Sequence, residues 1–71
     1  MITKENLNSI GFVSVDSTLY CDDGWEHEFN IKNQELWYIN DGYGEPEFLC
    51  RITKFDGLKE LLEILDKPDY L

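Results

Sequence analysis

The segment Trp25-Glu-His-Glu-Phe-Asn-Ile31 decides the fold class, because its apolar and polar side chains alternate along its whole length. Successive side chains of a β-strand point to opposite faces of a sheet. The segment is therefore predicted as a strand with one apolar and one polar face. The apolar face carries Trp25, His27, Phe29 and Ile31, and the polar face carries Glu26, Glu28 and Asn30.

Turn-forming residues flank this strand, and further strands follow them. Cys-Asp-Asp-Gly at 21–24 and the segment 32–34 are predicted turns, and a loop with two glycines and Pro46 occupies 41–46. Aromatic and β-branched residues predict strands over Phe12–Tyr20, Glu35–Asn40 and Glu47–Thr53. Short connections favour antiparallel neighbours, so a four-stranded meander is expected. Both faces of Glu35–Asn40 are apolar, so the sequence does not indicate which of them is buried.

A helix is predicted at each end of the chain. Thr3 suits an N-cap, Ile2 can pack on Leu7, and Gly11 suits a left-handed C-terminal position. A second helix ends before Pro68. Its apolar stripe consists of Phe55, Leu58, Leu61, Leu62 and Leu65. The expected fold is one α+β domain over residues 1–71, in the order α-β-β-β-β-α, with the second helix covering one face of a small antiparallel four-stranded sheet.

Composition indicates a globular cytoplasmic domain. Hydrophobic residues make up 42% of the chain and aromatic residues 14%, which is too apolar for a disordered acidic tail. The N-terminal sequence Met-Ile-Thr-Lys-Glu-Asn lacks the apolar stretch of a signal peptide, and no segment resembles a membrane span. In the reducing cytoplasm, Cys21 and Cys50 are expected to be free thiols.

Negative charge is concentrated in the stretch from Asp16 to Glu47. This acidic stretch holds nine acids and one base, a net charge of −8 out of −9 for the whole chain. A regional field of this kind attracts basic partners and repels nucleic acid and anionic membranes. Direct DNA or RNA binding, which needs a basic patch, is therefore not expected.

The residues that could support catalysis lack the required context. His27 is the only histidine and lies on the apolar face of its predicted strand, where histidine usually packs. The three serines, Ser9, Ser14 and Ser17, have no nucleophile motif around them. With fifteen acids in a short chain, some carboxylates will be close by chance, so proximity alone does not indicate acid–base catalysis. The chain is not expected to be an enzyme.

No cofactor or metal is expected either. Cys21, Asp22, Asp23 and His27 form the only mixed cluster, and they lack the paired spacing of zinc sites. Turn formation explains the aspartates more simply. The glycine-rich segment Gly42-Tyr43-Gly44 is flanked by acids, which would repel a phosphate.

Protein binding remains as the best-supported class of function. The carboxylates expected to contact a partner share the acidic stretch, and Tyr43 is the expected aromatic anchor among them. They are Asp22, Asp23, Glu26, Glu28, Asp41, Glu45 and Glu47. The competing interpretation is a solvated sheet face above a core of aromatics. Strand carboxylates recur every ~6.7 Å, against one charge per ~1.7 Å of duplex DNA, so any nucleic-acid mimicry is sparse.

Two segments carry a resemblance to known proteins: the opening Thr3-Lys-Glu-Asn-Leu7 with Ile10-Gly11-Phe12, and the closing helix within Ile52–Leu65. With the aromatic strands between them, the chain resembles small uncharacterised proteins of phages and mobile elements from AT-rich bacteria. In size, acidity and lack of catalytic motifs it is also similar to anti-CRISPR proteins. That resemblance implies binding to a CRISPR-Cas effector and blocking of its guide or target, and it transfers no individual residue.

The sequence thus predicts a non-enzymatic cytoplasmic inhibitor that binds the basic surface of a nucleic-acid-processing protein, with an anti-CRISPR role as the specific expectation. One alternative is a structural or assembly module that pairs through a sheet edge. The other is a small-ligand or metal-binding domain centred on Cys21 and His27.

Overall fold

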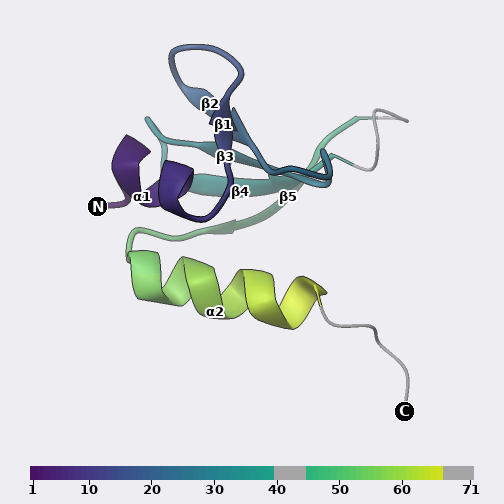
Figure 1. Cartoon of the computed structure of the whole chain (residues 1–71). Coiled ribbons are helices and arrows are strands. Elements are labelled where there is room, and N and C mark those ends of the chain that lie inside the picture. Colours follow the sequence, from purple (N-terminus) through teal and green to yellow (C-terminus); the bar gives the residue numbers. More distant parts are fainter. Residues whose placement is uncertain (40–44, 67–71) are drawn as a thin grey trace.

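The structure, a computed structural model, describes residues 1–39 and 45–66 (Figure 1). It is an α+β fold with an antiparallel sheet and two helices, as the sequence predicts. The elements in chain order are α1 (Lys4–Ser9), β1 (Val13–Ser14), β2 (Leu19–Cys21), β3 (His27–Asn30), β4 (Glu35–Tyr38), β5 (Glu47–Arg51) and α2 (Phe55–Asp66).

The sheet has five strands in the order β1-β2-β3-β4-β5, each antiparallel to the next, so the prediction of four strands is wrong. The predicted strand Phe12–Tyr20 is two strands joined by a tight turn. Asp16 Oδ1 accepts hydrogen bonds from the amides of Thr18 (2.8 Å) and Leu19 (3.0 Å), which bends the chain. These amides also hold the pKa of Asp16 below its usual value.

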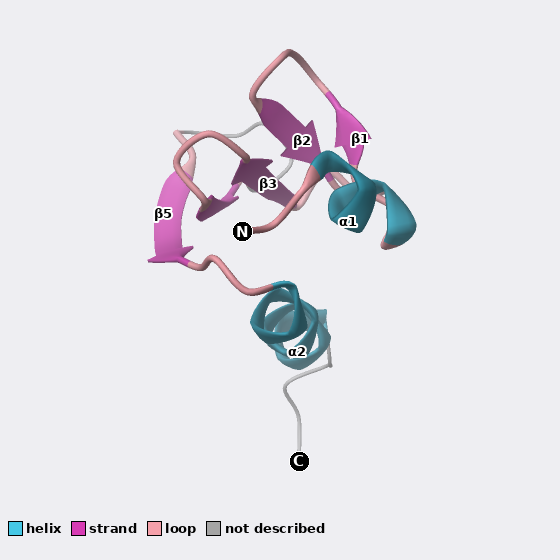
Figure 2. Cartoon of the chain, turned by 90° about the vertical axis from the view of Figure 1, so that its left-hand side faces the viewer, coloured by secondary structure: helices cyan, strands magenta, loops and turns pink. Residues whose placement is uncertain are grey.

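Both helices lie on the same side of the sheet, which curves around them (Figure 2). The strand register places Tyr20, Phe29 and Leu36 next to one another on that covered face. They are joined in the core by helix and loop residues, with Ile2, Leu7, Phe12 and Leu58 fully or almost fully buried. Since Leu36 is buried, β4 turns Trp37 to the opposite side, which answers the question that its sequence left open.

The uncovered side, here called the open face, follows from the same register. Leu19 pairs with Asn30 and Asn30 with Glu35, while Glu28 pairs with Trp37 and Trp37 with Phe48. The predicted alternation of β3 is confirmed, because His27 and Phe29 are buried and Glu28 and Asn30 lie on the open face. Trp25 does not belong to the apolar face as predicted, since it precedes β3 and is 57% exposed.

The N-terminal segment follows the predicted pattern and adds one feature that the sequence analysis missed. Thr3 caps α1 in a reciprocal pair with Asn6, Ile2 and Leu7 share the core, and Gly11 has φ +94°. The missed residue is Gln34, which is buried in the β3–β4 turn with φ +57°. Its side chain accepts from Ile2 N (2.8 Å) and donates to Ile2 O (3.0 Å) and Ile31 O (2.8 Å).

The C-terminal helix packs over most of the predicted stripe. Leu58 is fully buried, and Phe55, Leu61 and Leu62 pack against the core cluster. Leu65 is 44% exposed, contrary to prediction, because α2 continues past the core with Ile64 exposed as well. The predicted stop at Pro68 lies outside the described residues. Neither α1 nor α2 is long and apolar enough to cross a bilayer.

The two cysteines are far apart in the sheet. Cys21 is on β2 and Cys50 on β5, with β3 and β4 between them, which at ~4.8 Å per strand separates them by ~14 Å. They also lie on opposite faces, since Cys21 pairs with Glu28 and Cys50 with Leu36. A disulfide needs Cα atoms within about 7 Å, so this fold cannot form one between them.

Candidate functional site

The topology collects much of the acidic stretch at one end of the sheet. In an antiparallel meander, the β2–β3 turn and the start of β5 lie at the same end (Figure 1). The turn contributes Asp22, Asp23 and Glu26, and the start of β5 contributes Glu47, with Glu45 just before it. These five residues are called the acidic end below.

Basic side chains of the described residues lie elsewhere. Lys32 is in the β3–β4 turn at the opposite end of the sheet, where Arg51 also ends β5 and Lys54 follows it. The other two described bases, Lys4 and Lys59, are on the helices, where Lys59 pairs with Asp56 at 3.7 Å. The charge imbalance of the sequence therefore becomes a spatial one, with a negative end that none of these bases neutralises.

Asp22 is occupied by the turn that it builds. Its Oδ1 accepts from the amides of Glu26 (2.9 Å) and His27 (3.1 Å), and its Oδ2 lies 3.0 Å from His27 Nδ1. An ionised carboxylate only accepts hydrogen bonds, so His27 Nδ1 donates. The ring of His27 is buried and packs against Tyr38, with centroids 5.8 Å apart. Asp22 thus positions the turn, and the exposed carboxylates of Asp23 and Glu26 are left to meet a partner.

Trp25 occupies an unusual position in the same turn. Its amide donates to Asp22 O at 3.2 Å, and its φ of +55° is in the left-handed region that favours glycine. Its side chain is 57% exposed between Asp23 and Glu26. Exposed tryptophans are enriched among the residues that dominate binding energy at interfaces. The acidic end therefore presents an aromatic side chain, while Tyr43, the predicted anchor, lies outside the described residues.

The mixed cluster of Cys21, Asp22, Asp23 and His27 does not form a metal site. Within residues 1–39 and 45–66, no three histidine, cysteine or acidic side chains are placed to hold an ion. The Cys21 thiol is buried, and burial, with the nearby carboxylates of Asp22 and Glu28, raises its pKa to about 11. It is therefore protonated at neutral pH, the state that is neither nucleophile nor metal ligand.

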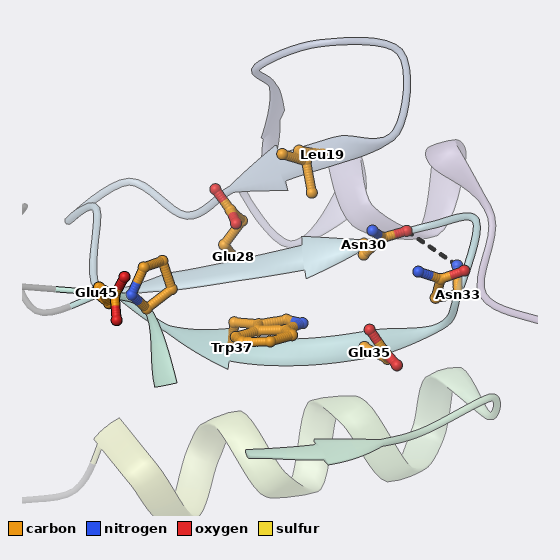
Figure 3. A pocket seen from close by; sticks show the side chains of 8 residues that line it. Leu19, Glu28, Asn30, Asn33, Glu35, Trp37 and Glu45 are labelled. Atoms are coloured by element: carbon orange, nitrogen blue, oxygen red, sulfur yellow. Dashed lines mark hydrogen bonds between the residues drawn. The ribbon is translucent and has the colours of Figure 1, made fainter. Parts of the chain in front are cut away.

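A groove of about 500 Å³ runs across the open face (Figure 3). Its lining combines three carboxylates, two amides, an indole and two apolar side chains: Leu19, Glu28, Asn30, Asn33, Glu35, Trp37, Glu45 and Pro46. Trp37 packs edge-to-face with Phe48, with ring centroids 5.4 Å apart at 71°. Glu28 is half-buried, and its pKa is raised by that burial and then by the charge of Asp16.

The groove and the acidic end together contain most of the predicted partner-binding residues. Asp22, Asp23, Glu26, Glu45 and Glu47 are at the acidic end, while Glu28, with Glu45 again, lines the groove. Asp41 and Tyr43 lie outside the described residues. Glu35 and Trp37 were not predicted as site residues, although an alternating pattern in β4 would have placed both on the face opposite Leu36.

Comparison of the chain with protein-family models, with curated proteins and with solved structures found no match.

Proposed function

We propose that this protein is a non-enzymatic, cytoplasmic binding inhibitor whose acidic end and open face dock on the basic surface of a nucleic-acid-processing protein. A CRISPR-Cas effector is the specific candidate. The observation that supports the proposal most directly is the acidic end, where five acids gather and no described base lies among them. A basic nucleic-acid-binding surface is the complementary partner for such a field.

The arrangement suits occupation of a nucleic-acid groove better than imitation of a duplex. Adjacent carboxylates on one face of a strand are ~6.7 Å apart, whereas duplex phosphates supply one charge per ~1.7 Å. Charge alone would therefore give modest affinity, and shape has to supply the rest. The open face offers that shape, since it carries Trp37 and Phe48 beside the carboxylates.

Charge reversal at the acidic end tests the proposal. The double variant Asp23→Lys/Glu26→Lys changes two exposed residues that make no side-chain contact needed for the fold. The matched control Glu5→Lys/Glu60→Lys makes the same change on exposed helix positions, and both variants move the net charge from −9 to −5. The assay measures inhibition of DNA cleavage by purified RNA-guided nucleases, and direct binding to them at 0.1 M and 1 M salt.

We expect the acidic-end variant to bind about tenfold or more weakly than the control, because each attraction becomes a repulsion. Binding of the unmodified protein should weaken strongly at 1 M salt, where the screening length falls to about 3 Å. Equal losses in the two variants, or binding that is indifferent to salt, would contradict an electrostatic docking surface at this end.

Assembly through a sheet edge has one observation in its favour. β5 is an edge strand and exposes Phe48 (49%) and Leu49 (38%). The register irregularity opposite Leu36 and Trp37 opposes it, since a bulge bends an edge away from regular pairing. Light scattering at micromolar concentration separates the two functions, because edge pairing requires a stable dimer.

A further inference from the structure

Building on the proposed function, we propose that the groove of the open face binds an arginine side chain of the basic partner. The guanidinium stacks on the indole of Trp37 and donates to the carboxylates of Glu28 and Glu35, with Glu45 at the other end of the groove.

The strand register sets these three side chains around one space. Glu28 of β3 is directly opposite Trp37 of β4, and Glu35 is two residues before Trp37 on the same strand. Glu28 and Glu35 are therefore diagonal neighbours, with Cα atoms about 7–8 Å apart. Figure 3 shows both carboxylates beside the indole, one above it and one beyond its end. A planar cation over the indole can reach both with its N–H groups.

The carboxylates of the groove are free to receive a cation. Neither Glu28, Glu35 nor Glu45 has a side-chain hydrogen bond or ion pair to another described residue. Glu35 is the cross-strand partner of Arg51, yet no ion pair joins them. Glu28 is half-buried next to the charge of Asp16, so its carboxylate is poorly solvated and gains more from a cation than an exposed acid would.

An arginine fits this lining better than a lysine or a metal ion. The guanidinium is flat, is weakly hydrated and has five donors in a plane, so it can stack on an aromatic face and meet carboxylates at its edge. Lysine is a compact, strongly hydrated charge that gains less from the indole. A metal ion would require the carboxylates to converge on one point, and no three acidic, histidine or cysteine side chains of the described residues are placed to do so.

The test is an NMR titration with two capped peptides, triarginine and trilysine, on the full chain. The indole N–H signals of Trp25 and Trp37 distinguish the acidic end from the groove. We expect triarginine to shift the Trp37 indole and the amides of Glu28 and Glu35 in a saturable way, and trilysine to bind about fivefold or more weakly. The variant Glu28→Gln/Glu35→Gln should weaken triarginine binding about tenfold, and the control Glu5→Gln/Glu60→Gln should leave it within twofold.

Three results would overturn the inference: equal binding of both peptides, an unshifted Trp37 indole, or equal affinity in the groove variant and its control. These outcomes are separable from failure of the proposed function. If the groove does not respond while charge reversal of Asp23 and Glu26 still abolishes inhibition, the acidic end acts alone. If the groove binds triarginine and charge reversal has no effect on any nuclease, the proposed target is wrong and the arginine site remains.

Discussion

Replacing Gln34 with alanine should remove the contact that fastens the N-terminal segment to the sheet. The side-chain amide of Gln34 makes three hydrogen bonds, two with the backbone of Ile2 and one with Ile31 O, at 2.8–3.0 Å. Gln34 is 3% exposed and Ile2 1%, so water cannot easily replace the lost partners. The substitution leaves a buried N–H and buried carbonyl groups without their partner.

The expected loss of unfolding free energy is about 3 kcal/mol, taking about 1 kcal/mol for each of the three hydrogen bonds. A domain of this length has roughly 4–11 kcal/mol in total, at about 0.05–0.15 kcal/mol per residue. The loss is therefore a large fraction of the whole. At about 4–8 °C per kcal/mol, the melting temperature should fall by about 12–24 °C.

Urea unfolding followed by circular dichroism measures this change. Asn33→Ala is the matched control, because Asn33 is exposed in the same turn and uses only its backbone N–H, which donates to Asn30 Oδ1. Its expected cost is below about 0.5 kcal/mol. Gln34→Gly should be less damaging than Gln34→Ala by up to about 1 kcal/mol, since glycine tolerates φ +57°. A Gln34→Ala variant within 1 kcal/mol of the Asn33 control would refute the reasoning.

Three further substitutions or treatments test other features. Glu28→Gln should stabilise the protein at pH 7, because the pKa of Glu28 is raised on folding and its ionised form is disfavoured in the folded state. This stabilisation should shrink as the pH falls through the raised pKa and vanish below the ordinary value of 4.5. Thermal melts at a series of pH values measure it, and stabilisation that persists below the ordinary value would contradict the explanation. Trp25→Gly should leave the melting temperature unchanged or raise it by a few degrees, because glycine adopts the positive φ of this position without strain. A fall in the melting temperature would mean that the indole stabilises the fold. In the native protein, iodoacetamide at pH 8 should alkylate Cys50 well before buried Cys21, whose pKa is about 11. Mass spectrometry measures the alkylation rate of each cysteine, and equal rates would contradict this prediction.

The sequence predicts those parts of the fold that depend on local periodicity. The two-residue period of β3 correctly placed His27 and Phe29 inside and Glu28 outside, and the stripe of α2 correctly identified Leu58 as a core residue. Both patterns are local, because each follows from the geometry of one element. The same is true of the cap at Thr3, which needs only the residues of the first turn.

The features that the sequence did not predict depend on contacts between distant segments or on turns whose positions were predicted wrongly. The strand breaks at Asp16 because its side chain accepts hydrogen bonds from two following amides. The apolar and β-branched residues around Asp16 favoured a continuous strand instead. Trp25 fits the alternating pattern of β3 in the sequence. In the structure the carboxylate of Asp22 accepts hydrogen bonds from the amides of Glu26 and His27, so the turn extends past Trp25 and β3 begins after it. Gln34 bonds to Ile2, which is 32 positions away in the sequence, and no local pattern predicts that contact.

The carboxylates of the acidic stretch separate into two groups once their partners are known. Asp16 and Asp22 accept backbone hydrogen bonds and build turns, so these two carboxylates serve the fold. Asp23, Glu26 and the glutamates of the groove have no such hydrogen bond, and none of them forms an ion pair with a described base. Burial, and after it the charge of Asp16, raises the pKa of Glu28, so its ionised carboxylate is disfavoured in the folded state. A cationic partner removes that cost on binding, so the second group, and not the net charge of the chain, is where a binding function should be sought.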